Sequence, residues 1–183
     1  TFSSCNQLRK IEFAKDSKLE IIDKNAFSNL PIEYISIPSQ VQQICEYAFS
    51  SCDQLRIIEF EKDSKLEIID EYSFSKSKIE NIKIPSQVKQ IRKYSFSFCN
   101  QLRQIEIEND SKLQKICSFA FYESPIESLT IPSQLIELEN GWCRSVLKLN
   151  KIKVSPENLR YRCIDDKMII GKSSMEKENY DCL

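Results

Sequence analysis

Apolar and polar positions along the chain recur with a fixed spacing. The segment that runs from Phe2 to Arg9 returns at Phe49 and, with small changes, at Phe96, so the main period is 47 residues. Fainter copies of the segment begin, within each period, at Phe27, Phe74 and Phe121. Units of 25 and 22 residues therefore alternate. A repeat of this length is typical of a solenoid, in which each unit buries its apolar face against its neighbours.

Each unit is predicted to contain two short strands. In the first strand, apolar Ile11 and Phe13 alternate with polar Lys10 and Glu12, which is the period of two of a strand with one buried face. The first strands are expected at 8–13, 32–37, 55–60, 79–84, 102–107 and 126–131. A degenerate seventh unit carries Leu149, Ile152 and Val154. In the shorter units a proline, which has no N–H for the ladder, ends the strand at Pro38, Pro85 and Pro132.

These units predict a repeat solenoid like that of leucine-rich repeat proteins. We expect a right-handed stack of 22- and 25-residue coils, rich in strand and poor in helix, with a parallel β-sheet on the concave face. The solenoid is expected to span 1–154, as six full units and the degenerate seventh, and 155–183 to form an irregular C-terminal segment. In that segment 161–164 and 167–170 flank the Asp165-Asp166 pair, which tolerates positive φ, and are predicted to form a hairpin.

The repeat also resembles a known family. The segment 32–52 carries the pattern Ile-x-x-Ile-x-Ile-Pro-x-x-Val-x-x-Ile-x-x-x-Ala-Phe-x-x-Cys and is similar to the BspA-type leucine-rich repeats of bacterial surface proteins, trichomonads and entamoebae. The tail 155–170 resembles the segment that follows the repeats in trichomonad members. The resemblance implies a surface or secreted binding protein. The chain departs from the family where a glycine is common, at Asp23, Cys45, Asp70, Arg92, Cys117 and Glu139.

Composition excludes several classes of function. The chain has 26 Lys and Arg against 27 Asp and Glu, so it lacks the basic excess of a general nucleic-acid binder. It contains no His, which removes Ser-His and Cys-His nucleophile pairs and Cys/His zinc sites. Its two glycines, Gly141 and Gly171, are too far apart for a phosphate-binding loop. We therefore expect no enzyme activity, no metal and no cofactor, and we find no membrane-spanning segment in the sequence.

The eight cysteines fall into two groups. Those in the repeats occupy equivalent places in separate coils, too far apart for disulfides, and are predicted to be reduced and buried: Cys5, Cys45, Cys52, Cys99 and Cys117. Those outside the register are free to pair or not: Cys143, Cys163 and Cys182. A glycosylation sequon at Asn109-Asp110-Ser111 falls in a corner loop.

The outward side chains of the first strands, which we call the open face, are where we expect a partner to bind. One column alternates in sign and is interpreted as a register and solubility device: Arg9, Glu33, Arg56, Glu80, Arg103 and Glu127. The candidate anchors are Tyr34 and Ile57, continued by Asn81 and Gln104. Their polar rim is expected to comprise Glu12, Glu59, Lys83 and Glu106.

These features favour a non-catalytic protein-binding module, a segment of a surface or secreted protein that attaches to a host-cell or matrix protein. The expected partner is a host or matrix protein, or else another subunit of an assembly. Nucleic acid is not expected. The alternative is an architectural spacer or an intracellular scaffold component without a ligand on the open face. The surface or secreted location follows from the resemblance, and the residues themselves leave a cytoplasmic location open.

Overall fold

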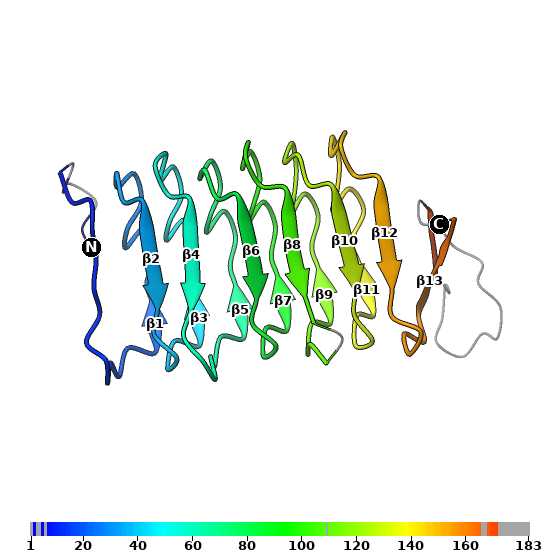
Figure 1. The fold of residues 1–183 in the computed structure, drawn as a ribbon, viewed down its shortest axis with the longest axis horizontal. Helices are drawn as coiled ribbons and strands as arrows, with labels where there is room; N and C mark the ends of the chain where they lie inside the picture. The colour runs from blue at the N-terminus through cyan, green and yellow to red at the C-terminus, as the bar shows by residue number, and fades with distance from the viewer. Residues whose placement is uncertain (1, 3–4, 6, 109, 166–167, 172–183) are drawn as a thin grey trace.

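The protein forms a stack of coils with one row of strands in front and a second row behind (Figure 1). The computed structural model describes residues 2, 5, 7–108, 110–165 and 168–171. The front strands are β2 (Tyr34–Ile37), β4 (Ile57–Phe60), β6 (Asn81–Ile84), β8 (Gln104–Ile107), β10 (Ser128–Ile131) and β12 (Lys151–Val154). The rear strands are β1 (Ile21–Ile22), β3 (Gln43–Ile44), β5 (Ile68–Ile69), β7 (Gln90–Ile91), β9 (Lys115–Ile116) and β11 (Glu137–Leu138). The described residues contain no helix. The predicted solenoid is confirmed.

The strands are short because each coil turns a corner every few residues. The front strands have four residues rather than the six predicted, and the rear strands have two. All pairs within each row are parallel. The first predicted strand, 8–13, is wrong as a strand, because only a single bridge from Lys10 to Tyr34 joins it to the stack. It lies in the first described coil, which packs against another described coil on one side only.

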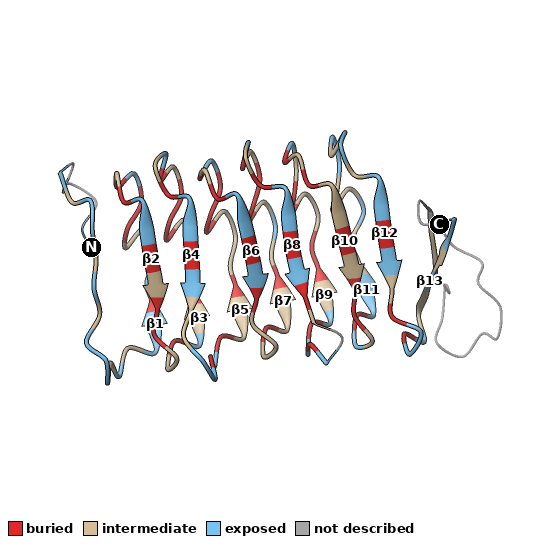
Figure 2. Ribbon diagram, in the orientation of Figure 1, coloured by how far each residue is buried: buried red, intermediate tan, exposed pale blue. Residues whose placement is uncertain are grey.

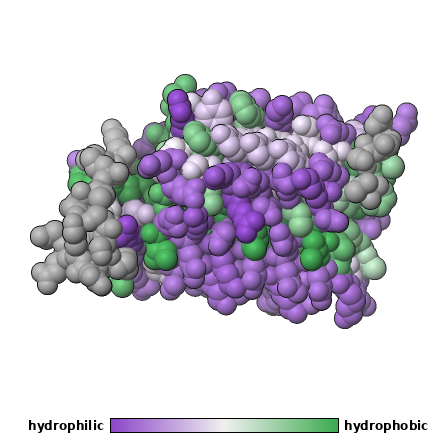
Figure 3. Space-filling model, turned by 180° about the vertical axis from the view of Figure 1, so that it is seen from behind, coloured by the Kyte–Doolittle hydropathy of each residue, from purple (hydrophilic) through white to green (hydrophobic). Residues whose placement is uncertain are grey.

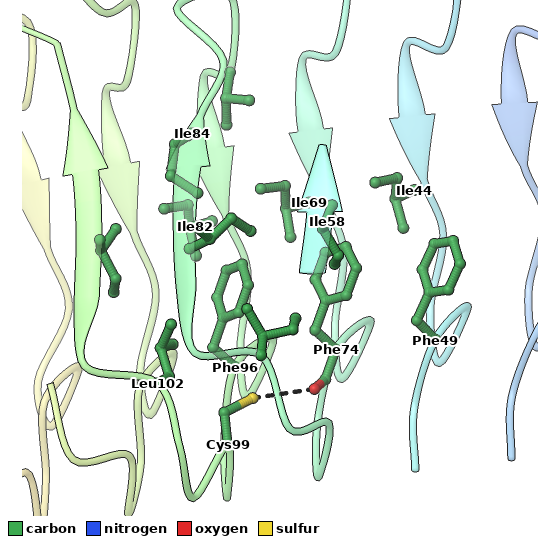
Figure 4. Packing of buried hydrophobic residues seen from close by; sticks show 14 of the residues in the cluster. Ile44, Phe49, Ile58, Ile69, Phe74, Ile82, Ile84, Phe96, Cys99 and Leu102 are labelled. Carbon is green, nitrogen blue, oxygen red and sulfur yellow. Dashed lines mark hydrogen bonds between the residues drawn. The ribbon is translucent and has the colours of Figure 1, made fainter. Parts of the chain in front are cut away.

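The core consists of rows of equivalent apolar side chains, one from each coil. Alternation along each front strand sends one set inward, so that a buried band crosses the row between exposed segments (Figure 2). Behind it, the phenyl rings of Phe27, Phe49, Phe74, Phe96 and Phe121 form a continuous stack. Successive ring centroids are 5.2 to 5.8 Å apart. Figure 4 shows three of these rings, Phe49, Phe74 and Phe96, in a row. A coil can thus bury its apolar face only against another coil.

Residues other than glycine turn the corners. One set with positive φ comprises Asn25, Tyr47, Tyr72, Tyr94 and Phe119, with Gly141 in the sixth coil. These residues lie two positions after the place where the family commonly has glycine, and the residues at that place are not among those with positive φ. The left-handed conformation is uncommon for aromatic residues. Stacking offsets its cost here, since Tyr47, Tyr72, Tyr94 and Phe119 form a second ring column with centroids 4.8 to 5.1 Å apart.

Hydrogen bonding between adjacent front strands alternates from one junction to the next. The junctions β2–β4, β6–β8 and β10–β12 each pair over four residues, and we call them paired junctions. The other three, which we call open junctions, share at most one residue pair: Lys10–Tyr34 before β2, none between β4 and β6, and Ser128–Gln104 between β8 and β10. The rear row is continuous from β1 to β11. The front sheet is therefore divided and the rear sheet is not.

Proline accounts for the alternation. At a paired junction the residue after the later strand donates its N–H to the previous coil, as Glu61 does to the Ile37 carbonyl at 3.0 Å. At an open junction the equivalent residue is Pro85 or one of its counterparts, which have no N–H to donate. Amide direction alternates along a strand, so Glu59, two residues before Glu61, points its amide toward β2, and Lys83 in the equivalent position points its amide toward β4.

The C-terminal segment covers the last coil. Strands β13 (Tyr161–Ile164) and β14 (Met168–Gly171) form the predicted antiparallel hairpin, and Asp165 has a φ of 52°. The Asn158 amide donates to the carbonyls of Pro132 and Leu135 at 2.7 and 3.0 Å. The Tyr161 hydroxyl accepts the N–H of Leu138 at 2.9 Å. These bonds satisfy polar backbone groups at the end of the stack.

The described cysteines are all free thiols. The prediction of free thiols in the repeats is confirmed, and Cys143 and Cys163 are also unpaired. Cys52, Cys99 and Cys117 are buried as predicted, but Cys45 is half-buried and Cys5 is exposed, so the prediction of burial is wrong for those two. Cys5 is exposed, with no described coil packed against its outer side, whereas the Cys99 thiol donates to the Phe74 carbonyl one coil earlier (Figure 4). Asn109 and Cys182 lie outside the described residues.

Candidate protein-binding face

The predicted anchors lie side by side on the open face. Tyr34 and Ile57 are directly paired across β2 and β4, with 37% and 52% of their surfaces exposed. Asn81 and Gln104 are paired in the same way across β6 and β8. The two pairs do not form one column, because the open junction between β4 and β6 separates them. The anchor is therefore a two-residue patch on a rigid pair of strands.

The rim residues divide between the same two strand pairs. The Glu59 carboxylate accepts a hydrogen bond of 2.9 Å from the Tyr34 hydroxyl, which raises the pKa of Tyr34 and fixes its ring. Lys83 lies 3.3 Å from Glu106 and 2.5 Å from Glu108. Hydrogen bonds to Glu108 and Glu106 raise the pKa of Lys83, so it stays charged. Glu12 lies in the first coil and pairs with Lys10.

The alternating charges pair, and they do so across the open junctions. The pairs Arg9–Glu33, Arg56–Glu80 and Arg103–Glu127 have N–O distances of 3.9, 3.2 and 3.4 Å. Each joins a longer coil to the shorter coil that follows it, near the start of the front strands. Exposed pairs such as these contribute about 0.2–1 kcal/mol each. They hold an open junction at one end while proline leaves the other end without a backbone bond.

A cleft of about 930 Å³ lies at the proline end of the junction between β4 and β6. Its walls include Glu59, Phe60 and Glu61 from one coil and Lys83 and Pro85 from the next. The Phe60 ring is only half-buried, unlike Ile84 and Ile107 at the same place in later coils. Sequence reasoning missed this cleft, although the spacing of the prolines was the available signal.

The rest of the surface offers less. Seen from behind, the face is largely hydrophilic, with hydrophobic residues in small separate patches (Figure 3). Burial raises the pKa of the Cys52 and Cys99 thiols to about 12, so neither is a nucleophile near neutral pH. Among the described residues no group of three or more Cys, Asp or Glu side chains has a geometry for a metal ion. No helix in the described part of the chain has the length and apolarity to cross a membrane.

The parallel stack and its aligned side-chain rows define a repeat solenoid of the leucine-rich repeat class. A sequence profile described as the BspA type leucine rich repeat region matches residues 1–68 and 67–177, with six copies. The chain therefore belongs to the BspA-type leucine-rich repeat family. No curated protein matches the sequence.

Solved structures of bacterial leucine-rich repeat proteins have the same fold. The pneumococcal vaccine antigen PcpA is 26% identical with a TM-score of 0.76, over 84% of this chain and 40% of that one. A leucine-rich repeat protein from Bacteroides ovatus is 26% identical with a TM-score of 0.69, over 85% of this chain and 45% of that one. A leucine-rich cell surface protein from Faecalibacterium prausnitzii is 17% identical with a TM-score of 0.61, over 85% of this chain and 47% of that one, and shows the fold alone. The chain thus spans less than half the length of each of these proteins.

Proposed function

We propose that this chain is a non-catalytic protein-binding module of a surface or secreted protein, which attaches to a host-cell or matrix protein through the open face. The observation that carries the proposal is the pairing of Tyr34 with Ile57, two exposed apolar side chains held side by side by four backbone residue pairs. Interfaces concentrate their energy in such aromatic and apolar anchors, with a polar rim around them. A similar protein of 26% identity is described as a pneumococcal vaccine antigen, which supports the surface location.

The remaining candidate residues extend the proposed site. Asn81 and Gln104 would supply adaptable polar contacts on the next strand pair, while Lys83 and Glu106 neutralise each other at its rim. Glu59 would act as the polar neighbour of the anchor, since it already orients the Tyr34 hydroxyl. Glu12 is more remote, in the first coil, and is the weakest member of the set.

The wild-type chain is first used to select binders from displayed libraries of host surface and matrix proteins. The affinity of each selected binder is then measured by biolayer interferometry for the wild-type chain and for the double variant Tyr34→Ala with Ile57→Asp. Truncating an aromatic anchor and adding a charge should weaken binding by more than tenfold, since a hot-spot residue contributes about 2 kcal/mol or more. Thermal melts check that the double variant remains folded, as expected from the exposure of the two side chains.

The matched control exchanges an ion pair on the same face, Arg56→Glu with Glu80→Arg. It retains opposite charges across the junction and should change affinity by less than threefold, in keeping with the small contribution of exposed pairs. If the Tyr34 and Ile57 variant keeps every binder at wild-type affinity, the open face is not the site. The second candidate function is an architectural spacer. It is favoured by three ion pairs on this face, in which the charged residues pair with each other rather than with a ligand.

A further inference from the structure

The open junction between β4 and β6 differs from the other two. It has no residue pair at all along the strands, whereas the others have one each. The backbone bond near its start runs from the Glu80 N–H to the Arg56 carbonyl at 3.3 Å, beside the Arg56–Glu80 ion pair. Toward the other end the strands share no residue pair, and Pro85 supplies no donor. The cleft lies where this backbone pairing is missing.

The outer face of β4 carries an ordered set of side chains beside the cleft. Ile57 and Glu59 lie on β4 and Glu61 directly follows its end, so the three alternate with Ile58 and Phe60; Ile57 and Glu59 are exposed and Glu61 is half-exposed. Such residues are about 6.6–6.8 Å apart along a strand. The half-buried Phe60 ring lies between the two carboxylates in sequence and lines the cleft with them. This one strand thus offers an apolar contact followed by two negative charges.

Neither carboxylate is neutralised within the described part of the chain. Glu59 accepts a bond from the Tyr34 hydroxyl, and Glu61 accepts the Ser39 N–H at 3.0 Å, but neither lies within ion-pair distance of a described Lys or Arg. The neighbouring cations Arg56 and Lys83 are paired with other carboxylates. In all, the cleft is lined by five acidic and three basic side chains: Glu59, Glu61, Asp63, Glu67, Glu108, Lys62, Lys65 and Lys83.

We infer that β4 and the cleft beside it bind an extended segment of the protein partner, in which an apolar residue and two Arg or Lys residues occupy alternate positions. An extended segment has the same two-residue spacing as β4, so its apolar side chain meets Ile57 when its two cations meet Glu59 and Glu61. The aliphatic part of an Arg or Lys side chain packs on Phe60 while its head reaches a carboxylate. This inference rests on the proposed function and names the chemistry of the partner.

Three fluorescein-labelled peptides test the inference by fluorescence anisotropy with the whole chain. The first places Leu and two Arg at alternate positions between serines, the second replaces both Arg with Glu, and the third has the composition of the first with Leu and both Arg adjacent. Each peptide is made with its sequence in the forward and in the reversed order. We expect the alternating basic peptide to bind at least tenfold more tightly than the acidic peptide and at least threefold more tightly than the shuffled one.

Charge reversal provides the decisive variant. Glu59→Arg with Glu61→Arg should invert the preference, so that the acidic peptide binds better than the basic one by a similar factor. The matched control, Glu20→Arg with Asp53→Arg, adds the same charge at exposed carboxylates away from the cleft and should leave the order of affinities unchanged. A shuffled peptide that binds as well as the alternating one, a preference that survives reversal of Glu59 and Glu61, or no binding of the basic peptide at millimolar concentration would overturn the inference.

The proposed function fails or survives on a separate measurement. Binders selected on the whole chain that lose affinity with Tyr34→Ala and Ile57→Asp support the open face even when the peptides show no preference. Conversely, a clear inversion of peptide preference together with no effect of the Tyr34 and Ile57 variant would confine binding to the cleft edge. The two results are therefore distinguishable.

Discussion

The phenylalanine stack should account for a large part of the stability, and its middle member gives the sharpest test. Phe74 is fully buried and stacks on two rings, Phe49 and Phe96, at 5.3 and 5.2 Å. Phe→Ala in a core costs about 3–5 kcal/mol, and each lost ring pair is worth about 0.5–1.5 kcal/mol beyond burial. Because two pairs are lost at once and coils above and below hold the cavity open, Phe74→Ala should fall in the upper part of the range.

Two further variants separate ring stacking from burial. Phe2 is 49% exposed and has one stacked neighbour, Phe27 at 5.6 Å, so Phe2→Ala should cost about 1–2 kcal/mol. Tyr72 has two stacked neighbours, at 4.8 and 4.9 Å, but is only half-buried. Tyr72→Ala should therefore cost more than Phe2→Ala and less than Phe74→Ala.

The assay is equilibrium unfolding in urea, followed by far-UV circular dichroism and by fluorescence of Trp142. That indole makes an edge contact with Phe121 at 6.3 Å, so it reports the C-terminal end of the stack. If the coils unfold as one cooperative unit, the two signals change together, and Phe74→Ala shifts both midpoints equally. Equal losses for the Phe74 and Phe2 variants would refute the reasoning, because position within the stack would then not matter.

Two other predictions concern the junctions and acid stability. In hydrogen exchange measured by NMR, the Lys83 amide, which faces the open junction, should exchange about fivefold faster than the Glu59 amide, which is paired with β2, since a net hydrogen bond is worth about 1 kcal/mol. Equal rates would contradict the division of the sheet. Hydrogen bonds from Lys115 and Ser118 lower the pKa of Glu139 from 4.5 to about 2, so its ionised form stabilises the fold above pH 4.5 and this contribution is lost as the pH falls toward 2. Urea midpoints measured from pH 6 to pH 2 should fall less for Glu139→Gln than for wild type.

Much of the fold could be predicted because a repeat constrains itself. The alternation of Ile11 and Phe13 with Lys10 and Glu12 recurs in six units, and a single error of register would expose every copy of the core at once. The same reasoning placed Tyr34 beside Ile57, since equivalent positions in adjacent coils must be neighbours. The C-terminal hairpin was predicted on different grounds, from the turn residues Asp165 and Asp166.

Features that depend on the ends or on backbone detail could not be predicted in this way. Equivalence along the repeat made Cys5 a copy of the buried Cys52, but among the described residues no coil packs over Cys5 from its outer side. Left-handed residues at the corners, such as Tyr47 and Tyr94, carried no glycine to mark them, and the stacking that tolerates them involves coils far apart in sequence. Predicting the cleft would have required knowing which front strands pair through their backbones, and the column of outward side chains does not show this.

Proline and charge follow the same two-coil period, and together they explain why the sheet divides without coming apart. Pro85 removes a donor at the unpaired end of the open junction, while the Arg56–Glu80 pair spans its beginning. In the rear row β5 pairs with both β3 and β7, so the backbone there crosses the same junction without a break. On the front side the junction is held near its beginning by this ion pair and by the backbone bond from Glu80 to Arg56, and the continuous rear sheet joins the two coils behind it. A binding cleft can form there without disturbing the buried rows of Ile and Phe, which run uninterrupted beneath it.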